Sequence, residues 1–142
     1  MDDESWLTIA LKIAERSPHR RFRTGAVICD RRGDILSVGW AHRNGTRRKL
    51  YSVHAELHAL TRLDRTRLEN GTVYVATIGR TGTQKLSAPC ADCVAVLGRS
   101  GLSRAVYTLT IVGFAEFALD HPPLLKRYKT QLQLAAQAAI LS

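Results

Sequence analysis

The spacing of apolar residues predicts the secondary structure of the N-terminal half of the chain. Near the start, apolar residues fall three or four positions apart, which is typical of one face of a helix over residues 4–16: Trp6, Ile9, Ala10 and Ile13. Two β-rich runs follow at 24–30 and 35–41, and the polar turn sequence between them predicts a hairpin. Residues 43–49 are polar and basic, and we expect them to form a loop.

The second half of the chain alternates predicted helices and strands. We expect a helix from His54 to about Asp64, a strand at 72–78, a polar loop through Ser87, a helix from Pro89-Cys90 to Gly98–Gly101, a strand at 105–112 and a last helix from Pro122. The pattern leaves a further strand near the C-terminus open. A hairpin followed by βαβ crossovers predicts a mixed central sheet with helices on both faces, a three-layer α/β/α fold. We expect a single domain over residues 1–142.

Composition narrows the class of protein. The chain has 142 residues, of which 45% are hydrophobic, and this suits one folded core rather than disorder. Three cysteines are too few for a disulfide framework and favour a reducing compartment, so we expect a cytoplasmic protein. No apolar stretch approaches the roughly 18–20 residues that cross a bilayer. The first residues, MDDESW, are acidic where a secretory signal is basic, so we expect neither membrane insertion nor secretion by that route.

Positive charge is concentrated in one part of the chain. The formal net charge is +9, and residues 12–49 hold eleven Lys and Arg residues against three acidic ones, a net charge of +8. A basic block of this kind suits a phosphate-bearing partner, either a nucleotide or a nucleic acid. It also suits a solvated face, so charge alone does not name a function.

Two short segments carry residues suited to binding a metal ion and moving protons: His54-Ala55-Glu56 and Pro89-Cys90-Ala91-Asp92-Cys93. A Cys-x-x-Cys pair at the start of a helix points both sulfurs to one side of a single turn, where the helix dipole favours thiolates. His54, at the start of another predicted helix, can supply an imidazole from the opposite side. Three ligands of this kind leave one tetrahedral position of Zn²⁺ for water, whose pKa then falls toward about 7.

Glu56 lies two residues after His54 and can point into the same pocket without binding the metal. A carboxylate there can take a proton from the activated water and return it to the substrate. Two other interpretations of the motif remain open. The cysteines can form a redox pair, which leaves His54 and Glu56 unexplained, or His58, on the same helix face as His54, can complete a closed structural Cys2His2 site.

Together the two segments match H-x-E…P-C-x-x-C, the signature of the zinc nucleobase deaminases. Over roughly residues 5–112 the chain resembles the cytidine and deoxycytidylate deaminase superfamily. Residues 14–40 look like its first helix, loop and hairpin, and the segments VHAELHAL and SAPCADCVAVLGRSGLSRAVY look like its two metal-binding helices and the strand that follows. The resemblance implies one Zn²⁺ per chain on His54, Cys90 and Cys93, with Glu56 as the proton shuttle. It also implies hydrolytic attack at C4 of cytosine (or C6 of adenine) and association into homo-oligomers.

The segment after the second predicted strand departs from the family pattern. Relatives often place an Asn directly after a Gly and an aromatic residue to bind the sugar, whereas this chain has Gly39-Trp40-Ala41-His42-Arg43-Asn44. Asn44 or His42 can replace that Asn through a shifted loop, and Trp40 can either stack on a base or pack as a rim aromatic. Ala55 and Arg23 complete the set of substrate-binding residues that we predict.

The function that these features favour is zinc-dependent hydrolytic deamination of cytosine to uracil in a free nucleoside or nucleotide, such as cytidine, deoxycytidine or dCMP. The alternative is deamination of cytosine within single-stranded DNA or RNA, which the basic loops favour. Adenosine deaminases of transfer RNA usually carry Pro-Val-Gly-Ala before the first strand, and Arg23-Thr24-Gly25-Ala26 differs from it, which favours the cytosine branch. A non-catalytic zinc-stapled module that binds nucleic acid is the remaining hypothesis.

Overall fold

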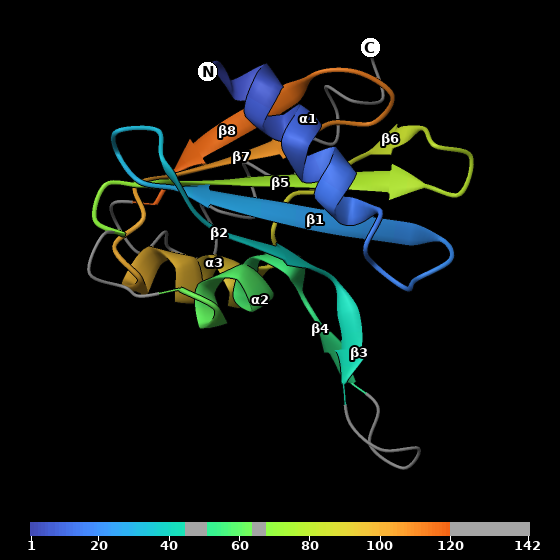
Figure 1. Cartoon of the computed structure of the whole chain (residues 1–142), viewed down its shortest axis with the longest axis horizontal. Coiled ribbons are helices and arrows are strands. Elements are labelled where there is room, and N and C mark those ends of the chain that lie inside the picture. The colour runs from blue at the N-terminus through green and yellow to red at the C-terminus, as the bar shows by residue number, and fades with distance from the viewer. Residues whose placement is uncertain (45–50, 64–67, 120–142) are drawn as a thin grey trace.

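A mixed β-sheet lies at the centre of the molecule in the computed structural model, which describes residues 1–44, 51–63 and 68–119 (Figure 1). The elements follow one another as α1 (Asp3–Ala14), β1 (Phe22–Cys29), β2 (Ile35–Trp40), β3 (His42–Asn44), β4 (Tyr51–Val53), α2 (Ala55–Thr61), β5 (Thr72–Gly79), β6 (Gln84–Lys85), α3 (Ala91–Arg99), β7 (Arg104–Thr108) and β8 (Phe114–Ala118). Within the described residues, six strands form this sheet, and β3 and β4 form a separate pair.

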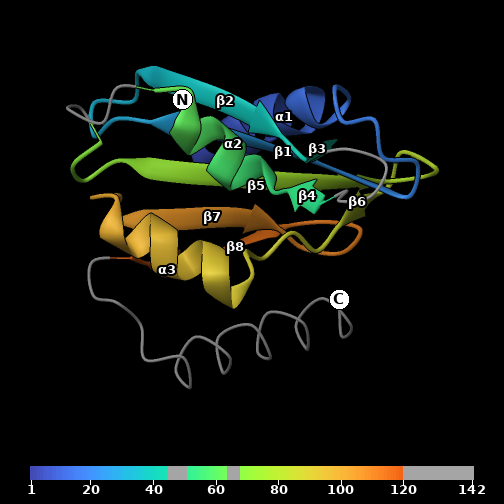
Figure 2. The same cartoon turned by 90° about the horizontal axis from the view of Figure 1, so that it is seen from below.

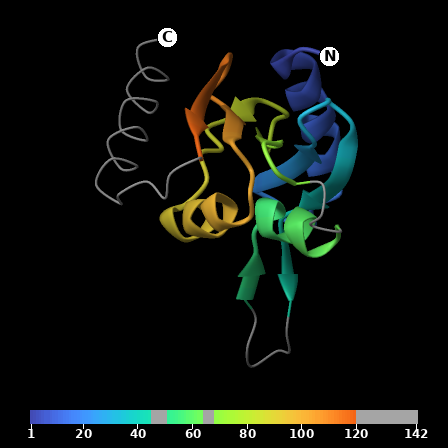
Figure 3. The same ribbon diagram turned by 90° about the vertical axis from the view of Figure 1, so that its left-hand side faces the viewer.

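The strand order of the larger sheet is β2-β1-β5-β7-β8, with β6 paired to β5. Strands β5 and β7 run parallel, because α3 returns the chain to the same end of the sheet, and the other pairs are antiparallel. The predicted mixed sheet is therefore confirmed. The β3–β4 pair extends away from the main sheet (Figures 1 and 3).

Helices cover both faces of the sheet, as the three-layer prediction requires. Helix α1 packs on one face, and α2 and α3 lie side by side on the other (Figures 1 and 2). Residues of β1 alternate between the two cores: Ala26 and Ile28 pack toward α2 and α3, whereas Val27 and Cys29 pack toward α1. Strand β5 is buried along its whole length because both of its faces are covered.

Two glycines let the helices approach the sheet closely. A Cβ atom on Gly25 would lie 2.4 Å from the Ala10 carbonyl oxygen of α1, and a Cβ on Gly39 would lie 2.4 Å from the Ala59 nitrogen of α2. Any larger side chain at these two positions would push the helix away from its strand. The distance of α2 from the sheet matters for function because this helix follows His54 and contains Glu56.

Several predicted boundaries differ from those of the structure. Helix α1 begins at Asp3 because the Asp2 carboxylate accepts a hydrogen bond from the Ser5 N–H at 2.9 Å, and it ends at Ala14. The strand predicted at 105–112 ends at Thr108, and the chain then turns and returns as β8, the strand that the sequence left open. Strands β4 and β6 were not predicted. Strand β3 includes residues 43 and 44, the first two residues of the basic segment 43–49 that was expected to be a loop. The helix expected from Pro122 lies outside the described residues.

Over residues 1–44, 51–63 and 68–119, the helices are too short or too polar to cross a membrane.

Candidate metal centre and active site

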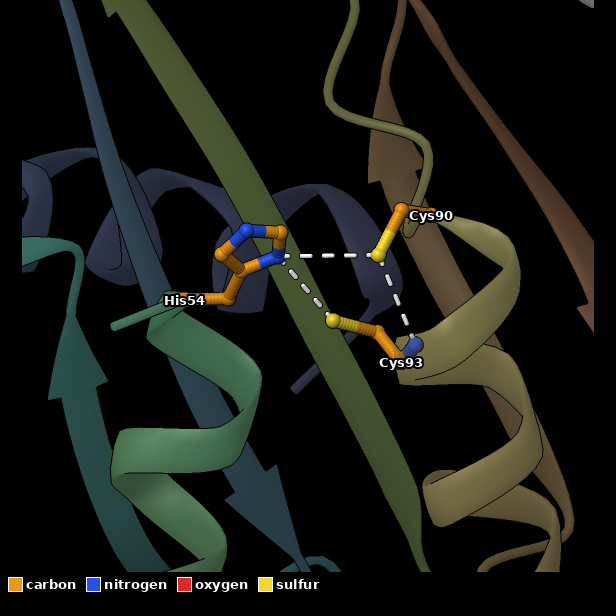
Figure 4. Close-up of side chains that lie close together, drawn as sticks. All are labelled: His54, Cys90 and Cys93. Carbon is orange, nitrogen blue, oxygen red and sulfur yellow. Dashed lines mark hydrogen bonds between the residues drawn. The ribbon is translucent and has the colours of Figure 1, made fainter. Parts of the chain in front are cut away.

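Two helix N-termini bring three metal-binding side chains together. His54 is the N-cap residue of α2, and Cys90 is the N-cap residue of α3, where its sulfur accepts a hydrogen bond from the Cys93 N–H at 3.4 Å. The His54 ring points across the gap between the helices toward both sulfurs (Figure 4). The positive ends of the two helix dipoles therefore face the sulfurs and favour their thiolate forms.

The distances within this group fit a zinc ion. The His54 Nδ1 atom lies 3.1 Å from the Cys93 sulfur and 3.6 Å from the Cys90 sulfur, and all three donor atoms fall within 4.8 Å of one another. Tetrahedral Zn²⁺, with bonds of about 2.0–2.1 Å to nitrogen and about 2.3 Å to sulfur, places such donors about 3.5–3.8 Å apart. One nitrogen and two sulfurs are also ligands that zinc prefers, and three protein ligands leave a fourth position for water.

Burial alone disfavours a charged sulfur at Cys93. The side chain is 1% exposed, and burial, together with the nearby Glu56 carboxylate, raises the pKa of the Cys93 thiol. A bound divalent cation reverses this preference and holds the sulfur as a thiolate. Binding of a metal ion by this group is therefore expected to release the proton of the Cys93 thiol.

Glu56 places a carboxyl group beside these ligands without joining them. It lies in the first turn of α2 and is 4% exposed. Burial raises its pKa, against smaller opposing contributions from its backbone N–H, the charge of His54 and the Cys93 side chain. A buried carboxyl group with a raised pKa is suited to accepting and releasing a proton near neutral pH.

A pocket of about 420 Å³ opens onto the metal-binding group. Its walls come from the segment before β1, from β1 and β5, from the residue after β2, from the start of α2 and from the loop before α3. They comprise His19, Phe22, Thr24, Ala41, His54, Ala55, Glu56, Val75, Thr77, Leu86, Ser87, Ala88 and Cys90. Phe22 and Thr24 share one face of β1, as Val75 and Thr77 share one face of β5. The pocket therefore combines an apolar wall with a few polar groups, as small-molecule sites commonly do.

The predicted substrate-binding residues divide into two groups. Ala55 lines the pocket, and so does Ala41, which stands where relatives often have Asn. Trp40, His42 and Arg23 are not among the lining residues. Arg23 alternates with Thr24 along β1 and so points to the opposite face of the sheet. The side chain of Asn44 lies outside the described part of the structure.

Trp40 and His42 instead belong to a cluster of rings and cations at the end of β2. The Trp40 ring lies edge-on to His58, with ring centroids 4.6 Å apart, and the guanidinium groups of Arg16 and Arg62 lie 5.4 and 5.1 Å from its centroid. His42 contacts His58 through its ring and the Trp40 carbonyl oxygen through its Nδ1 atom at 2.9 Å. These contacts favour the interpretation of Trp40 as a rim aromatic over stacking on a base.

His58 faces this cluster and not the metal-binding group. Its Nδ1 atom accepts a hydrogen bond from the Trp40 N–H at 3.1 Å. Burial, with the positive charges of His42 and Arg62, lowers the pKa of His58 and favours its neutral form. Within the described residues, the donor group contains His54, Cys90 and Cys93 but not His58. The arrangement therefore favours a three-ligand site over the closed Cys2His2 alternative.

Sequence reasoning missed several residues of the pocket wall, including His19, Phe22, Thr24, Thr77 and Ser87. The alternation of side chains along β1 and β5 contains a signal for three of them, because residues that share a face with the core positions Ala26 and Val75 extend into the pocket. The positions of His19 and Ser87 depend on how loops fold back over the sheet, which no local pattern predicts.

The fold and this site define a class: a three-layer α/β/α enzyme with a His-Cys-Cys zinc centre and a buried carboxyl group in one pocket. The match to a known family is specific. Residues 1–109 match the model of the family described as the cytidine and deoxycytidylate deaminase zinc-binding region, and the chain belongs to this family. It is thus a zinc-dependent deaminase, a hydrolase, with His54, Cys90 and Cys93 positioned to bind the ion.

Solved structures share the fold. They include a cytidine deaminase from Burkholderia pseudomallei (TM-score 0.63, 20% identity, 84% of this chain and 94% of that chain) and a dCMP deaminase from cyanophage S-TIM5 (TM-score 0.60, 19% identity, 75% and 82%). A cytidine deaminase from Mycobacterium tuberculosis also matches (TM-score 0.52, 21% identity, 76% and 85%). At these identities the likeness concerns the fold alone. No curated protein matches the chain.

Proposed function

We propose that the chain converts cytosine to uracil in a free nucleoside or nucleotide, with one zinc ion held by His54, Cys90 and Cys93. The observation that carries the proposal is the position of Glu56, whose buried carboxyl group lines the same pocket as His54 and Cys90. In this proposal Glu56 carries protons beside the position at which a bound zinc ion would activate water, as hydrolytic removal of an amino group requires.

The proposed chemistry divides the work between the ion and the protein. When bound, zinc lowers the pKa of a water molecule to about 7. Glu56 would take a proton from the attacking water and deliver it to N3 of the base, and a further proton would reach the departing amino group through the same carboxylate. A C4–O bond forms, the C4–N bond breaks, and the products are uracil and ammonia. The raised pKa of Glu56 suits it for both steps.

The substrate class is supported by the size of the pocket and by the relatives. A pocket of about 420 Å³ suits a base with its sugar. The cyanophage S-TIM5 dCMP deaminase, which shares the fold, has been crystallised with dCMP and dUMP. The Burkholderia and Mycobacterium relatives are cytidine deaminases. A homo-oligomeric state, a cytoplasmic location and a single domain over residues 1–142 stay predictions.

The second candidate substrate is cytosine within single-stranded nucleic acid. The observation that favours it is the basic segment Arg20-Arg21, which lies next to the exposed ring of Phe22, a residue of the pocket wall. Both candidates share the reaction and the catalytic group and differ only in what is attached to the sugar.

Replacing Glu56 tests the proposed function. We expect Glu56→Gln to keep one zinc ion per chain and to lose ammonia release by about 10²- to 10⁴-fold, because the amide cannot carry the proton. Glu69→Gln, at an exposed position outside the pocket wall, serves as the matched control. The substrates are cytidine, deoxycytidine, CMP, dCMP, adenosine and a single-stranded oligonucleotide, with uracil or hypoxanthine detected by mass.

Two outcomes would contradict the proposal. Turnover by Glu56→Gln at the parent rate would exclude the shuttle role. A zinc-loaded parent protein that deaminates none of the cytosine substrates, yet unfolds when zinc is chelated, would instead indicate the non-catalytic nucleic-acid-binding module.

A further inference from the structure

A second hollow adjoins the pocket. It measures about 620 Å³ and is formed by the segment between α1 and β1, with Pro18, His19, Arg20, Arg21 and Phe22 along its wall. His19 and Phe22 also line the pocket that contains Glu56. The two spaces therefore border each other at these two side chains.

Within the described residues, this hollow is positively charged. Arg20 and Arg21 are exposed, and neither forms an ion pair with the described residues. Among the residues that line either space, the only acidic one is Glu56, which is buried at the metal-binding end. Two guanidinium groups without a carboxylate partner present fork-shaped donors that match the oxygens of a phosphate.

Between the two spaces, His19 and Phe22 offer an apolar ring and an unused polar atom. Phe22 is 57% exposed although it begins a strand of the central sheet. The Nε2 atom of His19 is shielded from solvent and has no hydrogen-bond partner among the described residues. Exposed aromatic rings and unpaired polar atoms at a pocket mouth are features that a bound ligand covers and satisfies.

We infer that the hollow along residues 18–22 is a subsite for a phosphate group on the sugar of the substrate, bound by Arg20 and Arg21. The inference rests on the proposed function, because it places the cytosine in the pocket beside Glu56. A nucleoside fills the pocket and leaves the hollow empty. A nucleotide fills both spaces, and its negative charge meets the two arginines. The substrate class is therefore cytosine nucleotides, whether free or within a strand.

The test compares a nucleotide with its nucleoside in three proteins. We measure kcat/KM for dCMP and for deoxycytidine in the parent, in the double variant Arg20→Gln/Arg21→Gln, and in the control Arg31→Gln/Arg32→Gln. The control also removes two adjacent exposed arginines, but these lie in the turn at the opposite end of β1, outside both spaces. Both double variants change the net charge equally, so a general electrostatic attraction affects them alike.

We expect the parent to prefer dCMP by about tenfold or more, since charge-assisted hydrogen bonds to phosphate are among the stronger polar contacts. The Arg20→Gln/Arg21→Gln variant should lose most of this preference, mainly through a higher KM for dCMP, whereas the control should keep it. Raising the salt concentration should reduce the preference in the parent. Calorimetry with Glu56→Gln should show tighter binding of dUMP than of deoxyuridine, without turnover.

A short single-stranded oligonucleotide distinguishes the two sources of the phosphate. If the oligonucleotide is turned over and also depends on Arg20 and Arg21, the subsite receives a phosphate of a strand; if only dCMP depends on them, it receives a mononucleotide, and both results support the inference. If the parent has the same kcat/KM for deoxycytidine and for dCMP, the inference is overturned and the proposed function remains intact. An equal loss in both double variants also overturns it. A parent that deaminates no cytosine substrate overturns the proposed function itself.

Discussion

Most of the polar side chains around the pocket are paired with one another. The hydroxyl groups of Thr24 and Thr77 lie 2.8 Å apart on neighbouring strands, and the Ser87 hydroxyl contacts the Val75 carbonyl oxygen and the Thr108 hydroxyl, both at 2.7 Å. His19 is different, because its shielded Nε2 atom has no partner among the described residues. An unpaired buried polar atom costs about 1–3 kcal/mol of stability. The unpaired Nε2 atom of His19 therefore lowers the stability of the protein. A substrate oxygen that accepts a hydrogen bond from this atom can offset the loss.

This imbalance leads to a prediction for His19→Phe. The phenyl ring has a similar shape and no polar atom, so the variant should be as stable as the parent or more stable by about 1 kcal/mol. It should also have a higher KM for its substrate, because it cannot donate or accept a hydrogen bond at the pocket wall. Thermal melting without substrate and steady-state kinetics check the two parts.

His42→Phe is the matched control for this prediction. It removes a histidine whose Nδ1 atom contacts the Trp40 carbonyl oxygen and which does not line the pocket, so it should be less stable than the parent with an unchanged KM. A His19→Phe variant that melts below the parent with an unchanged KM would assign this residue to packing alone.

At the residue scale, sequence reasoning grouped the residues that are close together along the chain. The spacings His54-x-Glu56 and Cys90-x-x-Cys93 determine on which side of a helical turn each side chain lies. These side chains therefore come together once the starts of α2 and α3 face each other. Trp40 and Arg23 depend on longer-range packing. The guanidinium groups of Arg16 and Arg62 lie over the Trp40 ring. The alternation of side chains along β1 directs Arg23 away from the pocket.

At the scale of elements, the position of the metal-binding group depends on how closely α2 lies on the sheet. The backbone of α2 passes over Gly39 of β2, where a Cβ atom would be 2.5 Å from the Ala55 carbonyl oxygen and 2.4 Å from the Ala59 nitrogen. Gly25 allows the same approach for α1 on the opposite face. Only α2 is next to His54 and contains Glu56, so the two glycines should differ in their effect on the site.

We therefore predict different outcomes for Gly39→Ala and Gly25→Ala. Both variants should lose about 1–3 kcal/mol of stability or more, because the added methyl group meets backbone atoms that cannot move aside without shifting a helix. Gly39→Ala should in addition bind zinc more weakly, since a displaced α2 moves His54 away from the two sulfurs. Competition with a chelator, well below the melting temperature, measures the affinity. Equal zinc affinities in the two variants would show that the position of α2 does not control the site.

Strands with a strong local pattern were predictable, and short strands that depend on a partner were not. Strands β1, β2 and β5 combine β-branched residues with flanking turn sequences, whereas β6 has two residues and exists through its pairing with β5. The strand predicted to reach residue 112 stops at Thr108 because the Gln84 side-chain amide donates to the carbonyl oxygens of Leu109 and Gly113, both at 2.8 Å. Gln84 is distant in sequence, so no local window contains this signal.

At the scale of the whole molecule, burial of ionisable groups links stability to pH. Cys29 is 2% exposed in the core under α1, and burial, with the nearby Asp30 and Asp34 charges, raises its pKa to about 12 from 9.0. Burial also raises the pKa of Tyr74, whose hydroxyl donates to the Asp3 carboxylate at 2.9 Å, and that of Tyr107. All three groups stay protonated in the folded chain at pH values where they ionise in the unfolded chain.

These shifts oppose the effect of overall charge at alkaline pH. Because the net charge of +9 falls as pH rises, repulsion alone predicts a more stable protein above pH 8. The buried groups predict the opposite. Above about pH 9 the unfolded chain binds fewer protons than the folded chain, so the free energy of unfolding decreases with rising pH. Cys29 alone contributes a slope of about 1.4 kcal/mol per pH unit between its unfolded and folded pKa values.

We predict that the zinc-loaded protein loses stability steadily from about pH 9 to pH 11, and that Cys29→Ala lowers this slope. The alanine variant should be less stable than the parent at pH 7, because a buried sulfur atom is lost, yet the difference between the two should shrink as pH rises. Urea unfolding at pH 7, 8, 9, 10 and 11 provides the slopes, and Tyr74→Phe should reduce the slope only above about pH 10, the ordinary pKa of tyrosine. Parallel curves for the parent and Cys29→Ala would mean that Cys29 does not couple folding to pH, and that charges elsewhere in the molecule set its alkaline stability.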